Sequence, residues 1–223
     1  MKRETDNIKQ VYADRENDKK LLKNHQGTYP HYISEERERA YKLIINKRFP
    51  NIENLKLLEV GAGVGVNLTF FHSIGFQYSN MFANELLDDR FEKLKNNFPQ
   101  VNCILGDATE IKLDQKFDIV FQSTVFSSIL SNELRTRLAA KMFDLTNDSG
   151  IVLWYDFVYN NPKNKNVRKV EMDEIKNLFP NAKRFEFYKV TLAPPIGRRV
   201  GAWYAFFNKF SFLRTHIIAV IHK

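Results

Sequence analysis

A short glycine-rich stretch constrains this chain more than any other part of its sequence. The apolar run at residues 55–60, Leu-Lys-Leu-Leu-Glu-Val, leads directly into Gly-Ala-Gly-Val-Gly at 61–65, and an apolar helical pattern follows at 66–74. Glycines at the point where a strand turns into a helix let the backbone approach a ligand closely. The segment therefore predicts a buried strand, a ligand-binding turn and a helix, in that order.

The rest of the chain continues this alternation of strands and helices. An amphipathic helix is expected from Ser34, its capping residue, to Pro50. Further strands are expected at 78–83, 101–105, 117–121, 151–157, 184–192 and 215–222, and further helices at 87–98, 130–145 and 172–179. The alternation implies an α/β domain whose parallel sheet has helices on both faces. We expect one domain over residues 34–223, preceded by a polar extension at 1–33 that acts as a lid.

Charge is distributed unevenly along the 223 residues. The formal net charge is +8, but residues 1–50 carry +4, residues 51–150 carry −4 and residues 151–223 carry +8. A chain that coated nucleic acid evenly would not need an acidic central block. The acidic and basic parts are therefore expected to face different ligands, and the basic parts to face an anionic one.

Cysteine, histidine and apolar content exclude several other classes. The single cysteine, Cys103, rules out an internal disulfide framework, and the five histidines have no mutual metal-ligand spacing, so we expect no metal. The N-terminus lacks the apolar region of a signal peptide, and no apolar run reaches the roughly 18 residues that a membrane-spanning helix needs. We expect a cytoplasmic protein.

Acidic residues near three strand ends narrow down the ligand of the glycine turn. A dinucleotide fingerprint needs a small residue where Val66 stands, and a phosphate-binding P-loop needs a Gly-Lys-Ser/Thr that is absent. Glu59 would repel a pyrophosphate and attract an ammonium group. Glu85 can accept hydrogen bonds from two ribose hydroxyls, and Asp107 can accept one from an adenine amino group beside the Ala108 N–H. S-adenosyl-L-methionine carries these groups and no phosphate.

Residues 59–65, Glu-Val-Gly-Ala-Gly-Val-Gly, resemble the first motif of the class I S-adenosylmethionine-dependent methyltransferases, and the resemblance covers about residues 50–160. It implies a Rossmann-like, doubly wound seven-stranded sheet, mostly parallel with an antiparallel C-terminal strand. It also places Gln122 beside the transferred methyl group. The cofactor-binding residues then expected are Glu59, Gly61, Ala62, Gly63, Gly65, Glu85, Leu86, Asp107, Ala108 and Gln122.

The residues that would act on the acceptor have weaker signals. Asp156, at the end of the fifth strand, is expected to contact the acceptor or to act as a general base, and a turn carboxylate is the alternative. Tyr159 and Asn160 begin a basic loop in which Arg168 would grip a phosphate or carboxylate, although a solvated loop explains it equally well. Tyr32 is expected to contribute from the N-terminal extension.

The segment at 194–210 is unusually aromatic and basic. It favours either peripheral contact with a membrane surface or an ordinary buried helix between the last two strands. The C-terminal tail is similar to that of uncharacterised bacterial methyltransferases associated with surface polysaccharide synthesis. This similarity implies a sugar nucleotide or glycan precursor as the acceptor.

Together these features predict a methyltransferase that moves a methyl group to an oxygen or nitrogen of a small, anionic acceptor. An RNA or other nucleic-acid methyltransferase is the alternative that net charge favours, but Gln122-Ser123-Thr124-Val125 is not the N/D-P-P-Y type of motif. Two further classes stay open, namely a cofactor-binding subunit without catalysis and a nicotinamide oxidoreductase. The sequence does not determine the oligomeric state.

Overall fold

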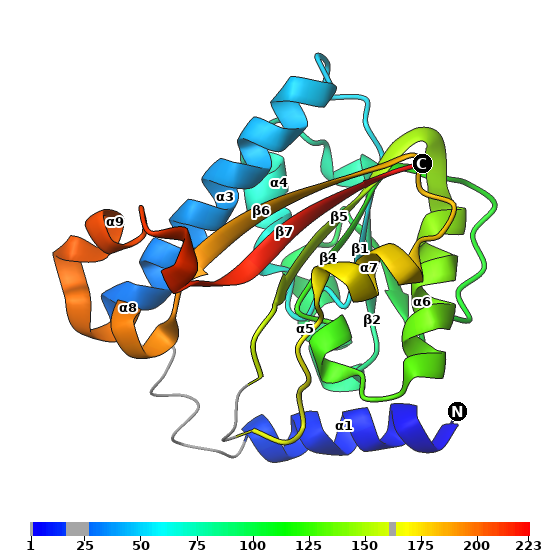
Figure 1. The fold of residues 1–223 in the computed structure, drawn as a ribbon. Coiled ribbons are helices and arrows are strands. Elements are labelled where there is room, and N and C mark those ends of the chain that lie inside the picture. Colours follow the sequence, from blue (N-terminus) through cyan, green and yellow to red (C-terminus); the bar gives the residue numbers. More distant parts are fainter. Residues whose placement is uncertain (1, 17–26, 161–163) are drawn as a thin grey trace.

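The computed structural model describes residues 2–16, 27–160 and 164–223. Within these ranges one seven-stranded sheet is flanked by helices (Figure 1). The strands are β1 (Leu57–Val60), β2 (Met81–Glu85), β3 (Asn102–Leu105), β4 (Phe117–Ser123), β5 (Thr146–Phe157), β6 (Arg184–Leu192) and β7 (Arg214–His222). The helices are α1 (Lys2–Glu16), α3 (Thr28–Arg48), α4 (Val66–Ser73), α5 (Asp88–Asn97), α6 (Asn132–Leu145), α7 (Met172–Leu178), α8 (Pro194–Val200) and α9 (Tyr204–Phe207).

The strand order is β3-β2-β1-β4-β5-β7-β6. Strands β1 to β5 pair in parallel, whereas β7 lies antiparallel between β5 and β6. The order reverses between β1 and β4, which is where open α/β sheets bind ligands beyond the carboxyl ends of their strands. We call this side of the sheet the carboxyl edge. The doubly wound, mostly parallel fold with an antiparallel C-terminal strand is confirmed.

Both faces of the sheet are covered, which explains the unbroken apolar runs of the central strands. Alternate residues of each strand face opposite layers, so Leu57 packs with α3, α4 and α5, whereas Leu58 packs with α6 and α7. Trp154 and Tyr155 divide in the same way between the two layers. A strand covered on both faces needs apolar residues at every position rather than at every second one.

Several element boundaries differ from those expected. Helix α3 begins at Thr28, and Ser34 lies inside it with its hydroxyl donating to Glu38 rather than capping a terminus. The boundary expected between residues 33 and 34 therefore falls within a helix. Residues 78–80 form a 3-10 turn before β2. Loop residues 161–163, expected to extend the basic loop, and residues 17–26 of the extension lie outside the described residues.

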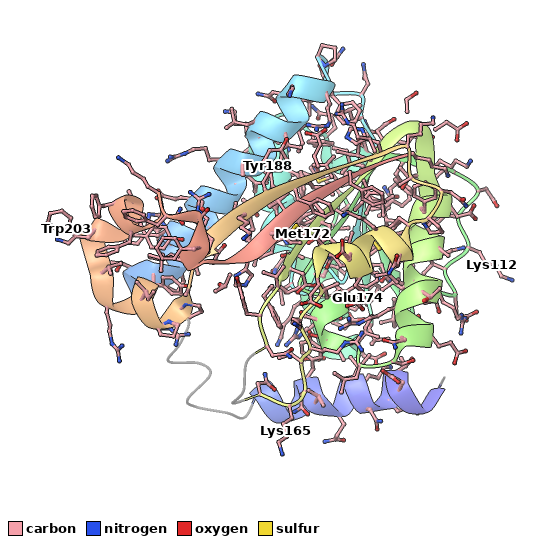
Figure 2. The ribbon with its side chains drawn as sticks, viewed as in Figure 1. Lys112, Lys165, Met172, Glu174, Tyr188 and Trp203 are labelled. Atoms are coloured by element: carbon pink, nitrogen blue, oxygen red, sulfur yellow. The ribbon has the colours of Figure 1, made fainter. Side chains whose placement is uncertain are left out.

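Residues 193–213, between β6 and β7, form a small unit that includes α8 and α9 and packs on the beginning of α3. Its core contains Tyr29, Leu192 and Tyr204, and the Tyr29 hydroxyl donates to the Leu192 carbonyl at 2.7 Å. A methyl group at Gly197 would lie 2.1 Å from the Tyr29 ring, so helix and ring are in close contact. Trp203 of this unit points away from the sheet (Figure 2). We call residues 193–213 the hairpin unit.

No helix in the described part of the chain combines the length and the apolar character needed to cross a bilayer.

Candidate cofactor and active site

The three glycines of the turn after β1 have different physical roles. Gly61, Gly63 and Gly65 all have positive φ angles, of 68°, 60° and 90°. A methyl group at Gly61 would lie 2.6 Å from Val125, and one at Gly65 would lie 2.4 Å from Phe98. At Gly63, no atom of the described residues lies within 4 Å of that position. Gly61 and Gly65 therefore serve packing, and Gly63 leaves open the space where a ligand can approach the backbone.

Glu85 connects the glycine turn to the end of β2. Its side chain is 5% exposed, and its Oε2 accepts a hydrogen bond from the Gly63 N–H at 2.7 Å. Its Oε1 accepts from the N–H groups of Leu86 and Leu87, at 2.8 and 2.9 Å. The expected contacts with ribose hydroxyls would use the acceptor capacity that these three bonds leave on the carboxylate. The Leu86 N–H thus helps to hold Glu85, and the contact of Leu86 with the cofactor stays a prediction.

Glu59 is the least satisfied acid of the site. It is 1% exposed, and burial raises its pKa to about 8 despite a hydrogen bond from Asn67. Asn67 Nδ2 donates to Glu59 Oε1 at 2.7 Å, but Oε2 has no hydrogen-bond partner among the described residues. A buried carboxylate oxygen without a donor is costly unless a ligand supplies one. The amino group of S-adenosylmethionine is a donor of the required charge.

Arg37 of α3 extends this arrangement, and sequence reasoning missed it. Its Nη2 donates to Asn67 Oδ1 at 3.4 Å, and its guanidinium carbon lies 5.2 Å from the centre of the Tyr155 ring. The buried Nε of Arg37 has no acceptor among the described residues. Arg37 and Glu59 are therefore linked through Asn67, and each has one unpaired polar atom. The only sequence signal for Arg37 was its place on an amphipathic helix, which does not distinguish it from surface arginines.

Tyr155 and His216 form a stacked pair on the face of the sheet that α3 covers. Their ring centres lie 5.1 Å apart with planes 13° from parallel, and the Tyr155 hydroxyl shares a hydrogen bond with Thr191 Oγ1 at 2.9 Å. Burial lowers the pKa of His216 to about 4, so the ring is neutral at neutral pH. Thr191 has a φ of 63°, unusual for a β-branched residue. The sequence did not predict this pair, because neither a tyrosine within a strand nor an isolated histidine belongs to a recognisable sequence motif.

Asp107 lies half-buried at the end of β3, as expected, and α1 contacts it. Its Oδ1 accepts from the Thr109 N–H at 2.9 Å, and its Oδ2 accepts from the Thr5 hydroxyl at 3.2 Å. Helix α1 runs along the carboxyl edge (Figure 1) and also contacts the loop after β4, where Glu4 accepts from the Ser131 N–H at 2.7 Å. The adenine end expected at Asp107 and Ala108 therefore lies beneath α1.

The loop after β4 is held by Gln122 and Asp156. Gln122 is fully buried, its Oε1 accepting from the Val125 N–H at 2.9 Å and its Nε2 donating to the Tyr155 carbonyl at 3.3 Å. Asp156 is also fully buried, and accepts from the Ser127 and Phe157 N–H groups at 3.1 and 3.0 Å. Burial raises the pKa of Asp156 to about 7. Its partners are the backbone and side chain of Ser127 and the backbone of Phe157, which fits the positioning of a loop.

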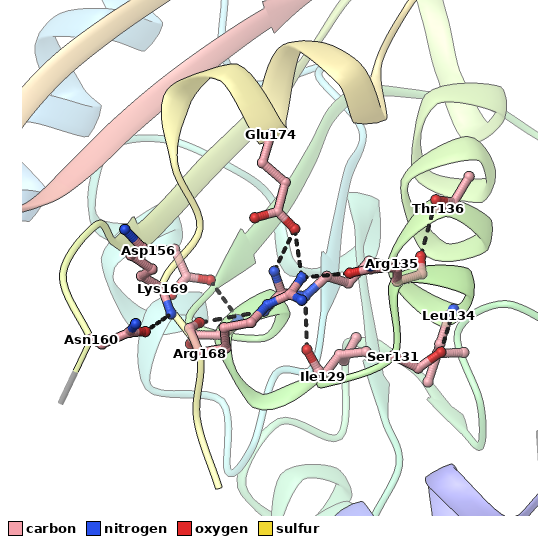
Figure 3. Close-up of polar contacts among 12 residues, drawn as sticks. Ile129, Ser131, Leu134, Arg135, Thr136, Asp156, Asn160, Arg168, Lys169 and Glu174 are labelled. Atoms are coloured by element: carbon pink, nitrogen blue, oxygen red, sulfur yellow. Dashed lines mark hydrogen bonds and ion pairs between the residues drawn. The ribbon is translucent and has the colours of Figure 1, made fainter. Parts of the chain in front are cut away.

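Arg168 belongs to an ion-pair network on the opposite face of the sheet (Figure 3). Its Nη2 contacts Asn132 Oδ1 and Glu174 Oε1, both at 2.8 Å. The same Glu174 oxygen accepts from the buried Arg135 at 2.5 Å, and Arg135 Nε donates to the Ile129 carbonyl at 2.7 Å. The guanidinium expected to grip an anion therefore already has a carboxylate partner.

The three remaining candidates for acceptor binding lie apart from one another. Tyr32 stacks on Tyr204 of the hairpin unit, with ring centres 5.2 Å apart. Tyr159 is 53% exposed, and Asn160 accepts from the Lys169 N–H at 3.0 Å. The structure does not gather these side chains around one point, and their contact with an acceptor stays a prediction. Among the described residues no group of histidine, cysteine and acidic side chains is arranged to hold a metal.

The chain resembles known methyltransferases in sequence and structure. Residues 58–154 match the family model of the methyltransferase domain. A malonyl-[acyl-carrier protein] O-methyltransferase of Priestia megaterium is 27% identical over 143 residues, which cover 62% of this chain and 50% of that protein. The chain thus spans about half the length of this curated relative.

Solved structures share the fold at low sequence identity. The magnesium protoporphyrin IX methyltransferase of Synechocystis PCC 6803, solved with S-adenosylhomocysteine, has a TM-score of 0.62 and 10% identity, covering 98% of this chain and 97% of that one. A SAM-dependent methyltransferase from Archaeoglobus fulgidus has a TM-score of 0.59 and 14% identity, and the match covers 88% of this chain and 100% of that one.

Over residues 58–154 the chain is thus similar to the methyltransferase domain, and its whole fold is that of the S-adenosylmethionine-dependent methyltransferase family. The family match covers β1 through most of β5, which is the part of the sheet that carries the glycine turn, Glu85 and Asp107. The cofactor of this family is S-adenosyl-L-methionine, and the open space at Gly63 and the unpaired Glu59 oxygen fit its methionyl end.

The different roles of the glycines give a testable contrast. Gly65→Ala should lower the free energy of unfolding by about 2–4 kcal/mol, because the methyl group meets Phe98 and the backbone is left-handed. Gly63→Ala should cost only about 1 kcal/mol, from the backbone alone, yet weaken binding of S-adenosylhomocysteine. Urea unfolding without cofactor and titration calorimetry measure the two effects. Equal losses of stability would contradict these assignments.

Glu59 should make the stability of the cofactor-free protein depend on pH. Its pKa rises on folding from 4.5 to about 8, so the folded state holds a proton that the unfolded state releases. The contribution of Glu59 to the free energy of unfolding is therefore fully present below about pH 4.5 and is lost as the pH rises toward 8. Glu59→Gln should gain a few kcal/mol relative to the parent between about pH 5 and pH 8.

Urea unfolding across this pH range measures the difference. Asp156 is present in both proteins, so its own titration cancels in the comparison. Parallel stability curves for the parent and Glu59→Gln would show that Glu59 is not the buried titrating group.

Proposed function

We propose that the chain transfers a methyl group from S-adenosyl-L-methionine to an oxygen or nitrogen atom of a small, anionic acceptor, such as a sugar nucleotide or glycan precursor. The observation that carries the proposal is the buried, unpartnered Glu59 oxygen beside the open backbone of Gly63. A positively charged donor without a phosphate satisfies that oxygen, and the amino group of the cofactor is such a donor.

Glu59 and Arg37 together suit the two charges of an amino acid group. The free Glu59 oxygen would bind the methionyl ammonium, and the free Arg37 N–H would bind the carboxylate. Asn67 bonds to both side chains and fixes their separation. Binding would satisfy two buried polar atoms at once, because each lacks a partner among the described residues.

At the other end of the site, Glu85, Leu86, Asp107 and Ala108 would hold the adenosine. We propose that α1 forms the lid of this part, because Thr5 bonds to Asp107 and Glu4 to the Ser131 N–H. Thr5 uses one oxygen of Asp107, so bound adenine would either share this oxygen or displace the Thr5 hydroxyl. A helix over this end of the site also keeps water away from the bound cofactor.

The cofactor, when bound, supplies an electrophilic methyl group on its sulfonium. The protein then has to align an acceptor atom with that methyl group and exclude water. Gln122 and Asp156 would do so indirectly, by fixing the loop at residues 123–128 through bonds to the Val125 and Ser127 N–H groups. We therefore assign Asp156 a positioning role. Tyr32, Tyr159, Asn160 and Arg168 are kept as proposed acceptor contacts.

Two observations support an anionic acceptor. Residues 151–223, which supply the strands next to the proposed methyl site, carry a net charge of +8. The relative from Priestia megaterium is by name a malonyl-[acyl-carrier protein] O-methyltransferase, and a malonyl group carries a carboxylate. An RNA acceptor is the main alternative, because phosphates also satisfy a basic surface.

Cofactor identity can be tested by ligand stabilisation. S-adenosylhomocysteine should raise the melting temperature, whereas NAD should not, because Val66 stands where a dinucleotide fingerprint needs a small residue. Glu85→Ala should weaken binding of S-adenosylhomocysteine by roughly tenfold or more, since it removes the carboxylate that holds the Gly63 loop. Glu92→Ala, at an exposed acid of α5, is the matched control. Stabilisation by NAD alone would overturn the cofactor assignment.

The acceptor class can be identified by transfer of a labelled methyl group. Labelled S-adenosylmethionine should transfer its label to the sugar-nucleotide or glycan fraction of a cell extract, and Glu59→Gln should reduce this transfer. Label confined to RNA would reject the small-acceptor proposal while leaving the enzyme class intact. Cofactor binding without transfer to any fraction would instead favour a non-catalytic subunit.

A further inference from the structure

The hairpin unit presents a cluster of aromatic side chains to solvent. Trp203, Phe206, Phe210 and Phe212 are 67%, 50%, 43% and 72% exposed. Neighbouring rings contact one another, with centres 6.2 Å apart for Trp203 and Phe206, and 5.9 Å apart for both Phe206–Phe210 and Phe210–Phe212. Four large apolar side chains exposed in one place mark an interaction surface rather than chance exposure. We call these four residues the aromatic surface.

The aromatic surface is not needed to hold the hairpin unit in place. The opposite side of the unit forms its own core around Tyr29, Leu192 and Tyr204, and Ile196, Val200, Phe207 and Leu213 pack against that core. Glu36 of α3 also accepts hydrogen bonds from the Tyr204 hydroxyl at 2.7 Å and the Thr191 N–H at 3.1 Å. The exposed rings can therefore be replaced without dismantling this core.

The hairpin unit contains exposed positive side chains and no acidic residue of its own. The sequence contains no Asp or Glu after Glu186. Arg198, Arg199 and Lys209 of the hairpin unit are all exposed. The inner Arg214 instead donates to the Asn208 and Lys189 carbonyls. The hairpin unit thus combines exposed aromatic rings with exposed cations, which is the composition of a segment that lies in a bilayer interface.

We propose that the hairpin unit docks on an anionic lipid bilayer, with the aromatic surface in the headgroup region and Arg199 and Lys209 against lipid phosphates. Figure 2 shows Trp203 at the outer margin of the molecule, where a flat surface can reach it. Because no described helix is suited to span a bilayer, contact would be restricted to the interface. Docking is a separate property from methyl transfer.

Two other binding partners fit the aromatic surface less well than an anionic bilayer does. In a symmetric dimer through this surface, each copy would bring its own Arg199 and Lys209 to the shared interface, and the accumulated positive charge would oppose contact. Single-stranded nucleic acid binds aromatic rings that offer their faces to successive bases. Here the rings are packed edge to face, with planes 85° apart for Trp203–Phe206 and 76° apart for Phe206–Phe210.

Tryptophan fluorescence provides a direct test, because the two tryptophans differ in environment. Trp154 is fully buried, whereas Trp203 is 67% exposed. Vesicles of phosphatidylglycerol and phosphatidylcholine should shift the emission of Trp203 to shorter wavelength, and brominated lipid should quench it. Vesicles of phosphatidylcholine alone should have a much weaker effect. Trp203→Phe should abolish both signals while binding persists in a flotation assay.

Paired variants separate the apolar and electrostatic contributions. Trp203→Ser with Phe212→Ser should weaken vesicle binding by about tenfold or more, and Arg199→Gln with Lys209→Gln by roughly 20- to 30-fold. Leu43→Ser, at an equally exposed apolar residue of α3, and Lys93→Gln with Lys112→Gln are the matched controls, expected to bind as the parent does. All variants should bind S-adenosylhomocysteine normally, which distinguishes failed docking from a failed methyltransferase.

Three results would overturn the proposal. One is equal binding to neutral and anionic vesicles that the charge variants leave unchanged. Another is no vesicle binding together with a dimer in light scattering that Trp203→Ser and Phe212→Ser dissociate. The third is no vesicle binding together with binding of single-stranded RNA that the same substitutions abolish.

Discussion

The carboxylate of Glu85 holds the cofactor edge of this protein together. It accepts three backbone N–H bonds from two different loops, those of Gly63, Leu86 and Leu87. A loop of glycines has many conformations open to it, and one buried acceptor selects among them at the cost of desolvating a charge. Because Glu85 ends β2 and the glycine turn follows β1, the bond also transmits the parallel register of these strands to the site. The positions of Glu59 and Asn67 relative to the open backbone depend on it.

Helix α3 is the second organising element, because consecutive residues serve different parts of the molecule. Glu36 binds the Tyr204 hydroxyl of the hairpin unit and the Thr191 N–H of β6, whereas Arg37 lies against Tyr155 and Asn67 beside the cofactor edge. A displacement of α3 would therefore alter the two regions together. The strained backbone of Thr191 lies where these regions meet. Strain of this kind persists only where several contacts determine the conformation.

The sequence was a good guide to the sheet and a partial guide to the site. The hydrophobic pattern located all seven strands, because the central strands are covered on both faces and are therefore largely apolar, but β2 begins three residues later and β5 five residues earlier than expected. The glycines and the acids at the ends of β1, β2 and β3 could be proposed as cofactor-binding residues from the sequence, because that role follows from their place at strand ends. Arg37, Asn67 and the Tyr155–His216 pair were not found, since each acts through a contact distant in sequence. The start of α3 was expected at Ser34 but lies at Thr28. The prediction was wrong because a serine followed by acidic residues is typical of a helix N-terminus but also occurs inside a helix.

The strand order also sorts charge across the molecule. Residues 51–150, with a net charge of −4, supply β1 to β4 on one side of the sheet, and residues 151–223, with +8, supply most of β5 and all of β6 and β7 on the other. The chain therefore has an electric dipole that runs across its strands, from the side of β3 to the side of β6. In the field of a charged surface or ligand this dipole exerts a torque before any contact forms. The molecule would approach an anion with its C-terminal strands foremost, and added salt would weaken this orientation.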